Sequence, residues 1–203
     1  MTDTRLLRWA RAGARAGAPP PLWFFTDSLR VPDPRPVVAR LPKGLSGVVF
    51  RHDADPARES LGRDLARLCR RRRLWLVVAG DPSLAARLGA GTHLRAGRRP
   101  LAASGLPRRR KTLVTSSAHS LPDLRRAARG HADLVFLSPV FTTQSHPGAP
   151  VLGPLRWLSV VRNASVRVAA LGGITGGTIR RLPRRLCCSV GFIGAMAGPD
   201  TGL

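Results

Sequence analysis

The chain has 203 residues, which is enough for one well-buried domain and short for two. Hydrophobic residues make up 43% of it and charged residues 22%, and its 21 glycines and 18 prolines indicate many turns, so a disordered chain is excluded. The formal charge of +23 comes almost wholly from arginine, since Lys43 and Lys111 are the only lysines.

This excess of arginine has two interpretations. It could be an electrostatic footprint for nucleic acid, anionic lipid or a phosphorylated ligand, or a compositional drift over the whole surface. Arginine clusters at residues 70–73, 108–110, 180–181 and 184–185 lie in separate segments, with few aromatic residues near them to stack on bases. Their spread favours drift, so nucleic acid is not the expected partner.

The cysteines and the hydropathy pattern indicate in which cellular compartment the protein is expected. Cys69, Cys187 and Cys188 are too few and too badly spaced for a disulfide framework or a metal site, so we expect small buried hydrophobic residues in a reducing compartment. No uninterrupted apolar run approaches the roughly 20 residues that a membrane span needs. We therefore expect a cytoplasmic protein with no membrane partner.

In chain order, the pattern first predicts a surface helix at residues 5–18, within an N-terminal extension over residues 1–21. Helices are expected at residues 37–41, 56–72 and 121–130, and another is expected to begin at Thr175. Strands are expected at residues 22–26, 47–50, 74–79, 92–94, 112–116, 134–140, 166–171 and 190–193. This alternation predicts a single α/β domain, a minimal (β/α)8 TIM barrel over residues 22–203, and a doubly wound open sheet is the competing fold.

Two parts of this barrel are expected to be irregular. Residues 92–107 have room for a short helix at most, because they hold two glycines and two prolines. Residues 195–203 leave no room for a full eighth helix, so we expect a truncated one. The N-terminal helix, or a second subunit of a homo-oligomer, should then cover the apolar face that is left.

Two glycine-bearing turns are the clearest candidates for ligand binding. Gly172 and Gly173 follow the seventh predicted strand, and Ile193 and Gly194 follow the eighth. Glycine lets backbone N–H groups approach an anion, and the loops after strands seven and eight are the usual phosphate site of such barrels. A helix beginning at Thr175 would add its dipole to the attraction. The alternative is that these glycines serve only strand-to-helix turns.

Hydroxyl and imidazole groups follow the fifth and sixth strands. Ser117 and His119 could bind a phosphate oxygen or move a proton, or His119 could merely pack beside a helix start at Ser120. In the loop after strand six, the hydroxyl and imidazole groups either bind phosphate or form a solvated turn. These loop residues are Thr143, Ser145 and His146.

These motifs, in this order, resemble the thiamine phosphate synthase and TenI family, a (β/α)8 barrel, over residues 22–196. That family has a serine and a histidine after strand five, Gly-Pro-Val-Phe-x-Thr-x-Thr-Lys after strand six and Gly-Gly-Ile after strand seven. The matching residues here are Ser117–His119, Ser138–His146 and Gly172–Ile174. The resemblance implies a transferase that joins thiazole phosphate to hydroxymethylpyrimidine pyrophosphate and releases pyrophosphate. The expected partners are therefore small phosphorylated substrates.

The departures from the family pattern concern metal and diphosphate. Arg51 alone remains of Gln-x-Arg-x-Lys after strand two, and His146 replaces the lysine after strand six. The two family aspartates that hold Mg²⁺ match Gly80, with Asp81 one position late, and Arg98. Magnesium is thus the cofactor expected for the family, but its ligands are missing here and no metal-binding residue is assigned. Without metal, the separation of pyrophosphate would depend on arginines such as Arg51, Arg95 and Arg98, which can neutralise charge and bind oxygens bidentately.

The TenI branch offers a second interpretation, because it acts as a thiazole tautomerase, lacks the metal aspartate and has glycine where Gly80 stands. Its acid-base histidine matches His119. A third alternative is a catalytically inactive barrel whose basic surface binds polyanions.

Overall fold

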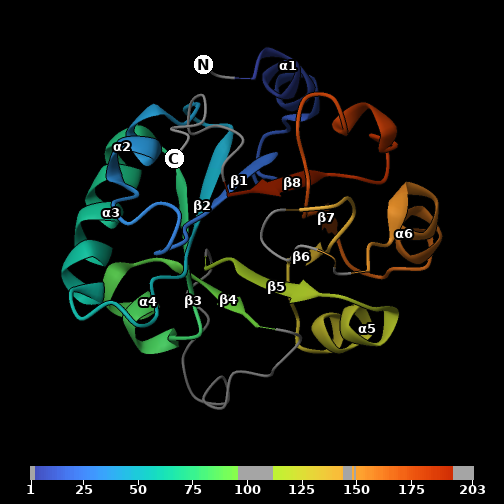
Figure 1. The fold of residues 1–203 in the computed structure, drawn as a ribbon. Coiled ribbons are helices and arrows are strands. Elements are labelled where there is room, and N and C mark those ends of the chain that lie inside the picture. Colours follow the sequence, from blue (N-terminus) through green and yellow to red (C-terminus); the bar gives the residue numbers. More distant parts are fainter. Residues whose placement is uncertain (1–2, 96–111, 144–147, 149, 194–203) are drawn as a thin grey trace.

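The strands close into a barrel. The structure, a computed structural model, describes residues 3–95, 112–143, 148 and 150–193. All strands pair in parallel and in chain order, and β8 pairs with β1, so the predicted closed barrel is confirmed and the open sheet is excluded (Figure 1). The strands are β1 Leu22–Phe25, β2 Ser46–Phe50, β3 Trp75–Ala79, β4 Gly91–Leu94, β5 Val114–Ala118, β6 Leu134–Leu137, β7 Val168–Ala170 and β8 Ser189–Phe192.

Helices follow most strands on the outside of the barrel. They are α2 Arg35–Arg40, α3 Arg58–Arg72, α4 Pro82–Leu88, α5 Leu121–Arg129 and α6 Gly153–Arg162, and a further helix, α1 Thr4–Gly13, precedes β1. The helices predicted at residues 37–41, 56–72 and 121–130 are confirmed as α2, α3 and α5, and α4 and α6 complete the pattern. The short helix considered within residues 92–107 and the truncated eighth helix after residue 194 fall largely outside the described residues.

The prediction of a helix that begins at Thr175 is wrong. In its place the chain turns and forms only a 3-10 helix, η1 Ile179–Arg181. Consecutive glycines at 176 and 177 disfavour a helix, and the side chains of Thr175 and Thr178 bond to backbone groups inside the turn. The segment after β7 therefore has no α-helix dipole to offer a ligand.

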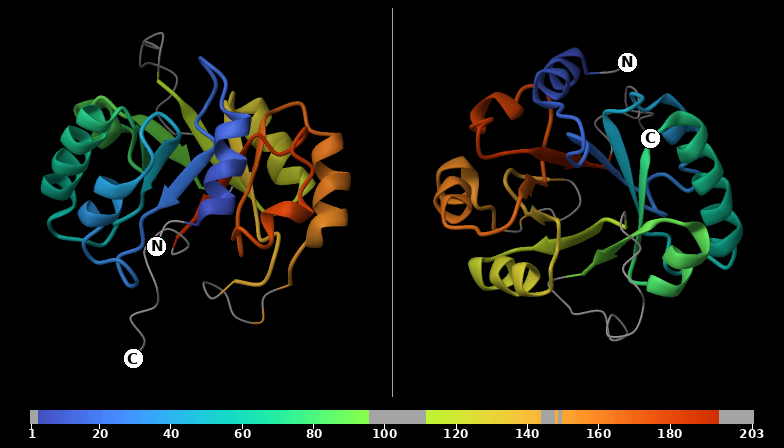
Figure 2. Two further views of the ribbon diagram at one scale, coloured as in Figure 1. Left: turned by 90° about the horizontal axis from the view of Figure 1, so that it is seen from above. Right: turned by 180° about the vertical axis from the view of Figure 1, so that it is seen from behind.

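Helix α1 packs against the barrel wall. Figures 1 and 2 show it outside the barrel beside β1, β8 and the segment after β7. Leu6 and Ala10 on one of its faces are fully buried in the same core cluster as Leu22 and Val190. The expectation that the N-terminal helix covers an apolar face is confirmed, although α1 ends at Gly13, earlier than predicted.

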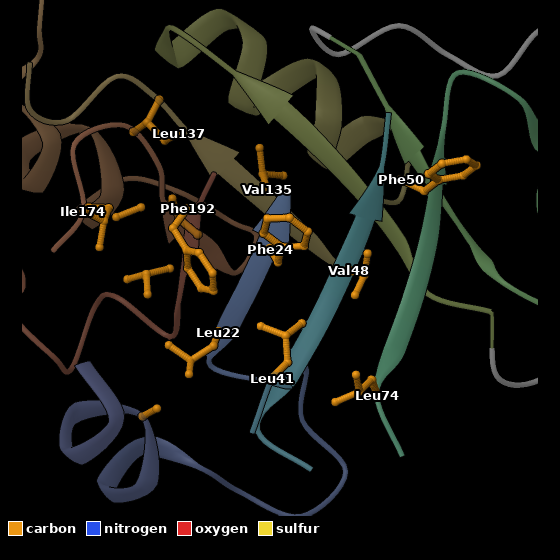
Figure 3. Close-up of a cluster of buried hydrophobic side chains, with 14 of the residues drawn as sticks. Leu22, Phe24, Leu41, Val48, Phe50, Leu74, Val135, Leu137, Ile174 and Phe192 are labelled. Atoms are coloured by element: carbon orange, nitrogen blue, oxygen red, sulfur yellow. The ribbon is translucent and has the colours of Figure 1, made fainter. Parts of the chain in front are cut away.

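Two apolar cores lie on the two sides of the strand wall, because side chains alternate along each strand. The outer core fills the space between strands and helices and includes Phe24, Val48 and Phe192 (Figure 3). The inner core fills the barrel itself around Trp23, Phe25, Val49, Val77, Leu134 and Phe136. The rings of Phe25 and Phe136 meet edge to face with centroids 4.8 Å apart. The interior is thus a packed core, and a ligand must bind at its rim.

The cysteine prediction holds for two of three residues. Cys69 and Cys187 are buried, and burial raises the pKa of each thiol to about 12. Cys188 is exposed at the residue level, which corrects the expectation of a buried side chain, although its Sγ donates to the Val168 carbonyl. Among the described residues, no helix combines the length and apolar character needed to cross a membrane.

Candidate functional site

The predicted site residues come together at one rim because all strands run the same way around a closed barrel. Those within the described chain sit at or just after the carboxyl ends of β2, β5, β6, β7 and β8; they are Arg51, Ser117, His119, Thr143, Gly172, Gly173 and Ile193. Ser145, His146 and Gly194, which were also predicted to bind substrate, lie outside the described residues.

The glycine pair after β7 is held against the loop after β6. Val140 N–H donates to the Leu171 carbonyl (3.0 Å), and Phe141 N–H donates to the Gly172 carbonyl (3.1 Å). Gly173 has a φ of +65°, and a Cβ placed there would lie 2.3 Å from the carbonyl oxygen of Thr142. No side chain fits at this point, so glycine has a structural reason to be here.

The same turn also offers hydrogen-bond donors. Within the described chain, no residue accepts a hydrogen bond from the amides of Gly172, Gly173 or Ile174. Consecutive backbone N–H groups near left-handed glycines can form a concave anion site without any helix. The close packing of the two loops is therefore compatible with backbone amides that have no acceptor in the described chain.

Threonine side chains fix the rest of this turn. Thr178 Oγ1 donates to the Gly173 carbonyl (2.9 Å) and accepts from Thr175 N–H (2.9 Å), while Thr178 N–H donates to Thr175 Oγ1 (3.2 Å). Gly176 N–H donates to Oδ2 of Asp3 at the start of α1 (2.6 Å). These bonds replace the missing helix as the support of the glycine pair.

His119 lies at the rim with one ring nitrogen engaged. Its Nδ1 is 2.9 Å from the carbonyl oxygen of Ser138, which can only accept, so Nδ1 carries the proton of this bond. In the neutral ring Nε2 is then an unprotonated nitrogen, and within the described chain no residue bonds to it. His119 therefore has the geometry of an acid-base group or of a ligand contact.

The backbone beside His119 belongs to a helix cap. Ser120 caps α5 through its side chain, and Asp123 accepts hydrogen bonds from the amide of His119 (3.0 Å) and the hydroxyl of Ser120 (2.8 Å). Burial acts to raise the pKa of Asp123, but those hydrogen bonds and the charge of Arg126 outweigh it and lower the pKa. The carboxylate thus stays ionised and anchors the histidine backbone.

Ser117 belongs to the barrel interior more than to the rim. Its Oγ is 2.9 Å from His93 Nε2, and His93 Nδ1 is 2.8 Å from the Thr115 hydroxyl. His93 is fully enclosed beside Phe25, and burial first, then the charge of Arg51, lowers its pKa to about 3. The neutral ring orients both hydroxyls, so the structure links Ser117 with His93 through a direct hydrogen bond.

Arginine and aspartate side chains cover the rim over β2 to β4. Arg51 Nε donates to the Thr26 carbonyl (2.9 Å), and its guanidinium lies 5.5 Å from the Phe25 ring centroid and 3.4 Å from Asp27. From the start of α3, Arg58 reaches the carboxylate of Asp53 (3.0 Å). The sequence patterns pointed to Arg51, Arg95 and Arg98, of which Arg98 lies outside the described residues. They assigned no role to Arg58 or Asp53.

The residues present do not fit a magnesium ion. Asp53 holds Arg58 with one carboxylate oxygen and contacts Arg95 with the other. Asp81 caps α4 through Oδ1, and its Oδ2 lies 3.8 Å from Arg58. The described chain contains no group of three or more His, Cys, Asp or Glu residues arranged for a metal. Of the segments outside the described residues, 96–111 and 144–147 contain no acidic residue, and 194–203 contains one, Asp200.

Comparisons with known proteins agree with this barrel. The family described as thiamine monophosphate synthase matches residues 24–195. The thiamine-phosphate synthase of Marinobacter nauticus is 31% identical over 186 residues, which is 88% of this chain and 83% of that protein. That of Thioalkalivibrio sulfidiphilus is 35% identical over 122 residues, 59% of this chain and 57% of that protein. The structure of thiamine phosphate pyrophosphorylase from Pyrococcus furiosus superposes with a TM-score of 0.68 at 22% identity, over 89% of each chain, and shows the shared fold.

Proposed function

Since the chain belongs to the thiamine monophosphate synthase family, we propose that it binds thiazole phosphate and joins it to hydroxymethylpyrimidine pyrophosphate, releasing pyrophosphate. The observation that carries this proposal is the turn after β7, where the amides of Gly172, Gly173 and Ile174 have no acceptor in the described chain. A phosphate group supplies acceptor oxygens for such amides.

Neighbouring groups would complete the phosphate contact. Strand β7 pairs with β8, so the carboxyl ends of the two strands are adjacent at the rim. Ile193, at the end of β8, and Gly194 would add backbone amides from the second turn. Thr143, Ser145 and His146 would add side-chain donors from the segment after β6, which begins with Val140 and Phe141 bonded to the carbonyls of Leu171 and Gly172.

The chemistry of the transfer asks little of an acid or base. The carbon–oxygen bond to pyrophosphate breaks and its electron pair leaves with the diphosphate. The thiazole nitrogen then forms a new bond to the pyrimidine methylene carbon, and no proton moves at that nitrogen. The protein would therefore act by holding the two reactants together and stabilising the leaving anion, and Arg51 is the predicted contact for that anion. Because the residues present do not fit magnesium, no step is assigned to a metal.

A direct assay tests the proposal. Purified protein is incubated with thiazole phosphate and hydroxymethylpyrimidine pyrophosphate, and thiamine phosphate is measured by chromatography. Product above background is expected, and Gly173→Ala should reduce it strongly because the new Cβ meets the Thr142 carbonyl. Absence of product above background, with magnesium added in a parallel reaction, would refute the synthase assignment.

His119 favours a second candidate, a thiazole tautomerase. Tautomerisation moves a proton between two positions of the substrate, so it needs the acid-base group that the alkyl transfer does not. The motivating observation is that His119 Nε2 has no partner in the described chain while Nδ1 is fixed by the Ser138 carbonyl. If a His119→Ala variant aromatises the non-aromatic thiazole phosphate as fast as the unmodified protein, this candidate is eliminated.

A further inference from the structure

Three arginines gather at the rim over β2, β3 and β4, on side chains that three different segments supply. Arg51 follows β2, Arg58 begins α3 and Arg95 follows β4. We propose that these arginines bind a diphosphate group without a divalent cation, with Arg95 lying across the end of β3 in place of a metal ligand. The inference rests on the proposed function, which supplies a diphosphate-bearing substrate, and concerns how that group is held.

Arg58 and Arg95 are arranged around one carboxylate, that of Asp53. Asp53 Oδ1 is 3.0 Å from Arg58 Nη2, and Asp53 Oδ2 contacts Arg95 Nη2. One small anion thus holds two guanidinium groups, one on each oxygen. A terminal phosphate also presents pairs of oxygens to planar guanidinium groups, which bind them bidentately. In the free protein Asp53 keeps the two arginines at a spacing that suits such a group.

Arg95 occupies the space over the end of β3. Gly80 has a φ of +70°, and a Cβ placed there would lie 3.5 Å from Arg95 Nε and 3.6 Å from its Cζ. The Arg95 guanidinium therefore lies directly over a residue that has no side chain. A carboxylate projecting from this position would meet Arg95 at once. The positive charge at this point of the rim comes from the protein itself.

A magnesium ion would have to compete with arginines for the acidic groups at this rim. A magnesium ion prefers several free oxygen ligands in an octahedral arrangement. Both oxygens of Asp53 are on guanidinium groups, and Asp81 is used as the cap of α4 and faces Arg58. A cation would have to displace two arginines to gain one carboxylate. An anion has to displace only the single carboxylate of Asp53 from Arg58 and Arg95.

Arg51 and Arg58 are partly buried cations with incomplete compensation in the free protein. Burial, and to a lesser degree the charges of Arg95 and Arg30, lower the pKa of Arg51, and Asp27 opposes this. The Nε of Arg58 is buried and has no hydrogen-bond partner in the described structure. Cations held close together with incomplete hydrogen bonding are stabilised when an anion of higher charge arrives.

The experiment titrates inorganic pyrophosphate into the full chain by calorimetry, once with EDTA and once with excess magnesium. Binding is expected in EDTA, with an affinity no weaker than in magnesium. An affinity at least tenfold weaker in EDTA, or no binding in either buffer, overturns the inference. Thiazole phosphate is titrated in parallel. If it binds when pyrophosphate does not, the proposed function survives without this inference; if neither binds, the phosphate cradle fails as well.

Two variants test the residues, each with a control of equal charge change. Arg95→Gln should weaken pyrophosphate binding roughly tenfold or more, as expected for the loss of a charge-assisted hydrogen bond. Arg67→Gln is its control, because Arg67 is an exposed residue within α3 that pairs with Asp64. Equal affinities of the two variants would contradict the proposal.

Asp53→Asn should have the opposite effect on pyrophosphate affinity. It removes the carboxylate that competes with the ligand for Arg58 and Arg95, so pyrophosphate should bind several-fold more tightly in EDTA. Asp64→Asn is the matched control, since it changes the net charge equally within α3. If Asp53→Asn weakens binding, Asp53 is a ligand or metal group and the inference is overturned. Thermal unfolding of each variant confirms that it is folded.

Discussion

Gly173 is the residue at which the structural and functional interpretations of the glycine turn can be separated. Gly173→Ala should lower the free energy of unfolding by about 1–3 kcal/mol, because the residue is left-handed and its Cβ would lie against the Thr142 carbonyl. It should also abolish thiazole phosphate binding, measured by calorimetry. The control is Gly89→Ala, where φ is +63° and nothing lies within 4 Å of an added Cβ.

Gly89→Ala carries the same backbone strain without the clash. It should cost about 1 kcal/mol of stability and leave ligand affinity unchanged, since Gly89 ends α4 far from the glycine turn. If Gly173→Ala binds thiazole phosphate as well as this control does, the turn after β7 is only structural.

His93 predicts how stability depends on pH. In the folded barrel its pKa is lowered to about 3, whereas the unfolded chain has the ordinary value of 6.5. Below pH 6.5, His93 therefore becomes protonated in the unfolded chain but stays neutral in the folded chain. The contribution of the neutral His93 to the free energy of unfolding is fully present above that pH and is lost as the pH falls toward 3. Between pH 6 and 4 stability should fall by about 1.4 kcal/mol per pH unit from this group.

Urea unfolding at several pH values measures this slope. A His93→Gln variant should be less stable at pH 7, because it loses ring packing against Phe25, yet its stability should change less between pH 6 and 4. Parallel curves for the two proteins would show that His93 is not the titrating group.

At the level of elements, α1 supports the glycine turn from outside the barrel. Asp3 caps α1 with Oδ1, which accepts from Arg5 and Leu6 amides, and holds Gly176 N–H with Oδ2. Asp3→Ala should lower stability by about 2–3 kcal/mol, as a lost cap and an unpaired amide. It should weaken thiazole phosphate binding more than pyrophosphate binding, because only the turn after β7 depends on this contact.

Asp3→Asn is the conservative control, since its carbonyl oxygen can still accept one of these hydrogen bonds. Its stability and thiazole phosphate affinity should lie between those of the unmodified protein and Asp3→Ala. Calorimetric titration with both ligands measures the two affinities. Equal losses for both ligands in Asp3→Ala would mean that α1 affects the whole barrel and not the turn.

The elements differ in how far the sequence predicts them. Buried parallel strands are short apolar runs, and every expected strand was found; the run at 134–140 ends at Leu137 because Pro139 cannot continue the ladder. The helix expected after Thr175 failed because local threonine hydrogen bonds and two glycines outweigh a helical pattern. Its loss leaves the turn dependent on Asp3, a contact across 173 positions that no local pattern reveals.

The site was predictable only where a motif marks it. Gly172, Gly173 and His119 lie at strand ends in short recurring patterns, so their place at the rim follows from a closed barrel. Asp53 lies in the loop after β2 and Arg58 begins α3 five positions later, so their ion pair depends on the conformation of that loop, which no motif marks. Ser117 was expected to act beside His119, but its bond to His93 depends on which side chains share the barrel interior.

Across the whole molecule, the charge of +23 is spread over many surfaces. Exposed arginines occur on α1, α3, α5 and η1, which lie on different sides of the barrel (Figures 1 and 2). A spread of this kind attracts any polyanion weakly, through counterion release, and selects none. In our proposal, the arginines that bind the substrate are those that neighbouring side chains hold in place at the rim.

This distinction predicts how a nucleic acid should bind. A short single-stranded RNA, followed by fluorescence anisotropy, should bind at low salt and lose nearly all affinity at an ionic strength of about 0.15 M. Pyrophosphate binding should fall much less, because Arg51 and Arg58 are partly buried and are fixed by hydrogen bonds to backbone carbonyls and by ion pairs. RNA that stays bound at that ionic strength and is displaced by pyrophosphate would show that the polyanion interpretation, rather than compositional drift, explains the charge.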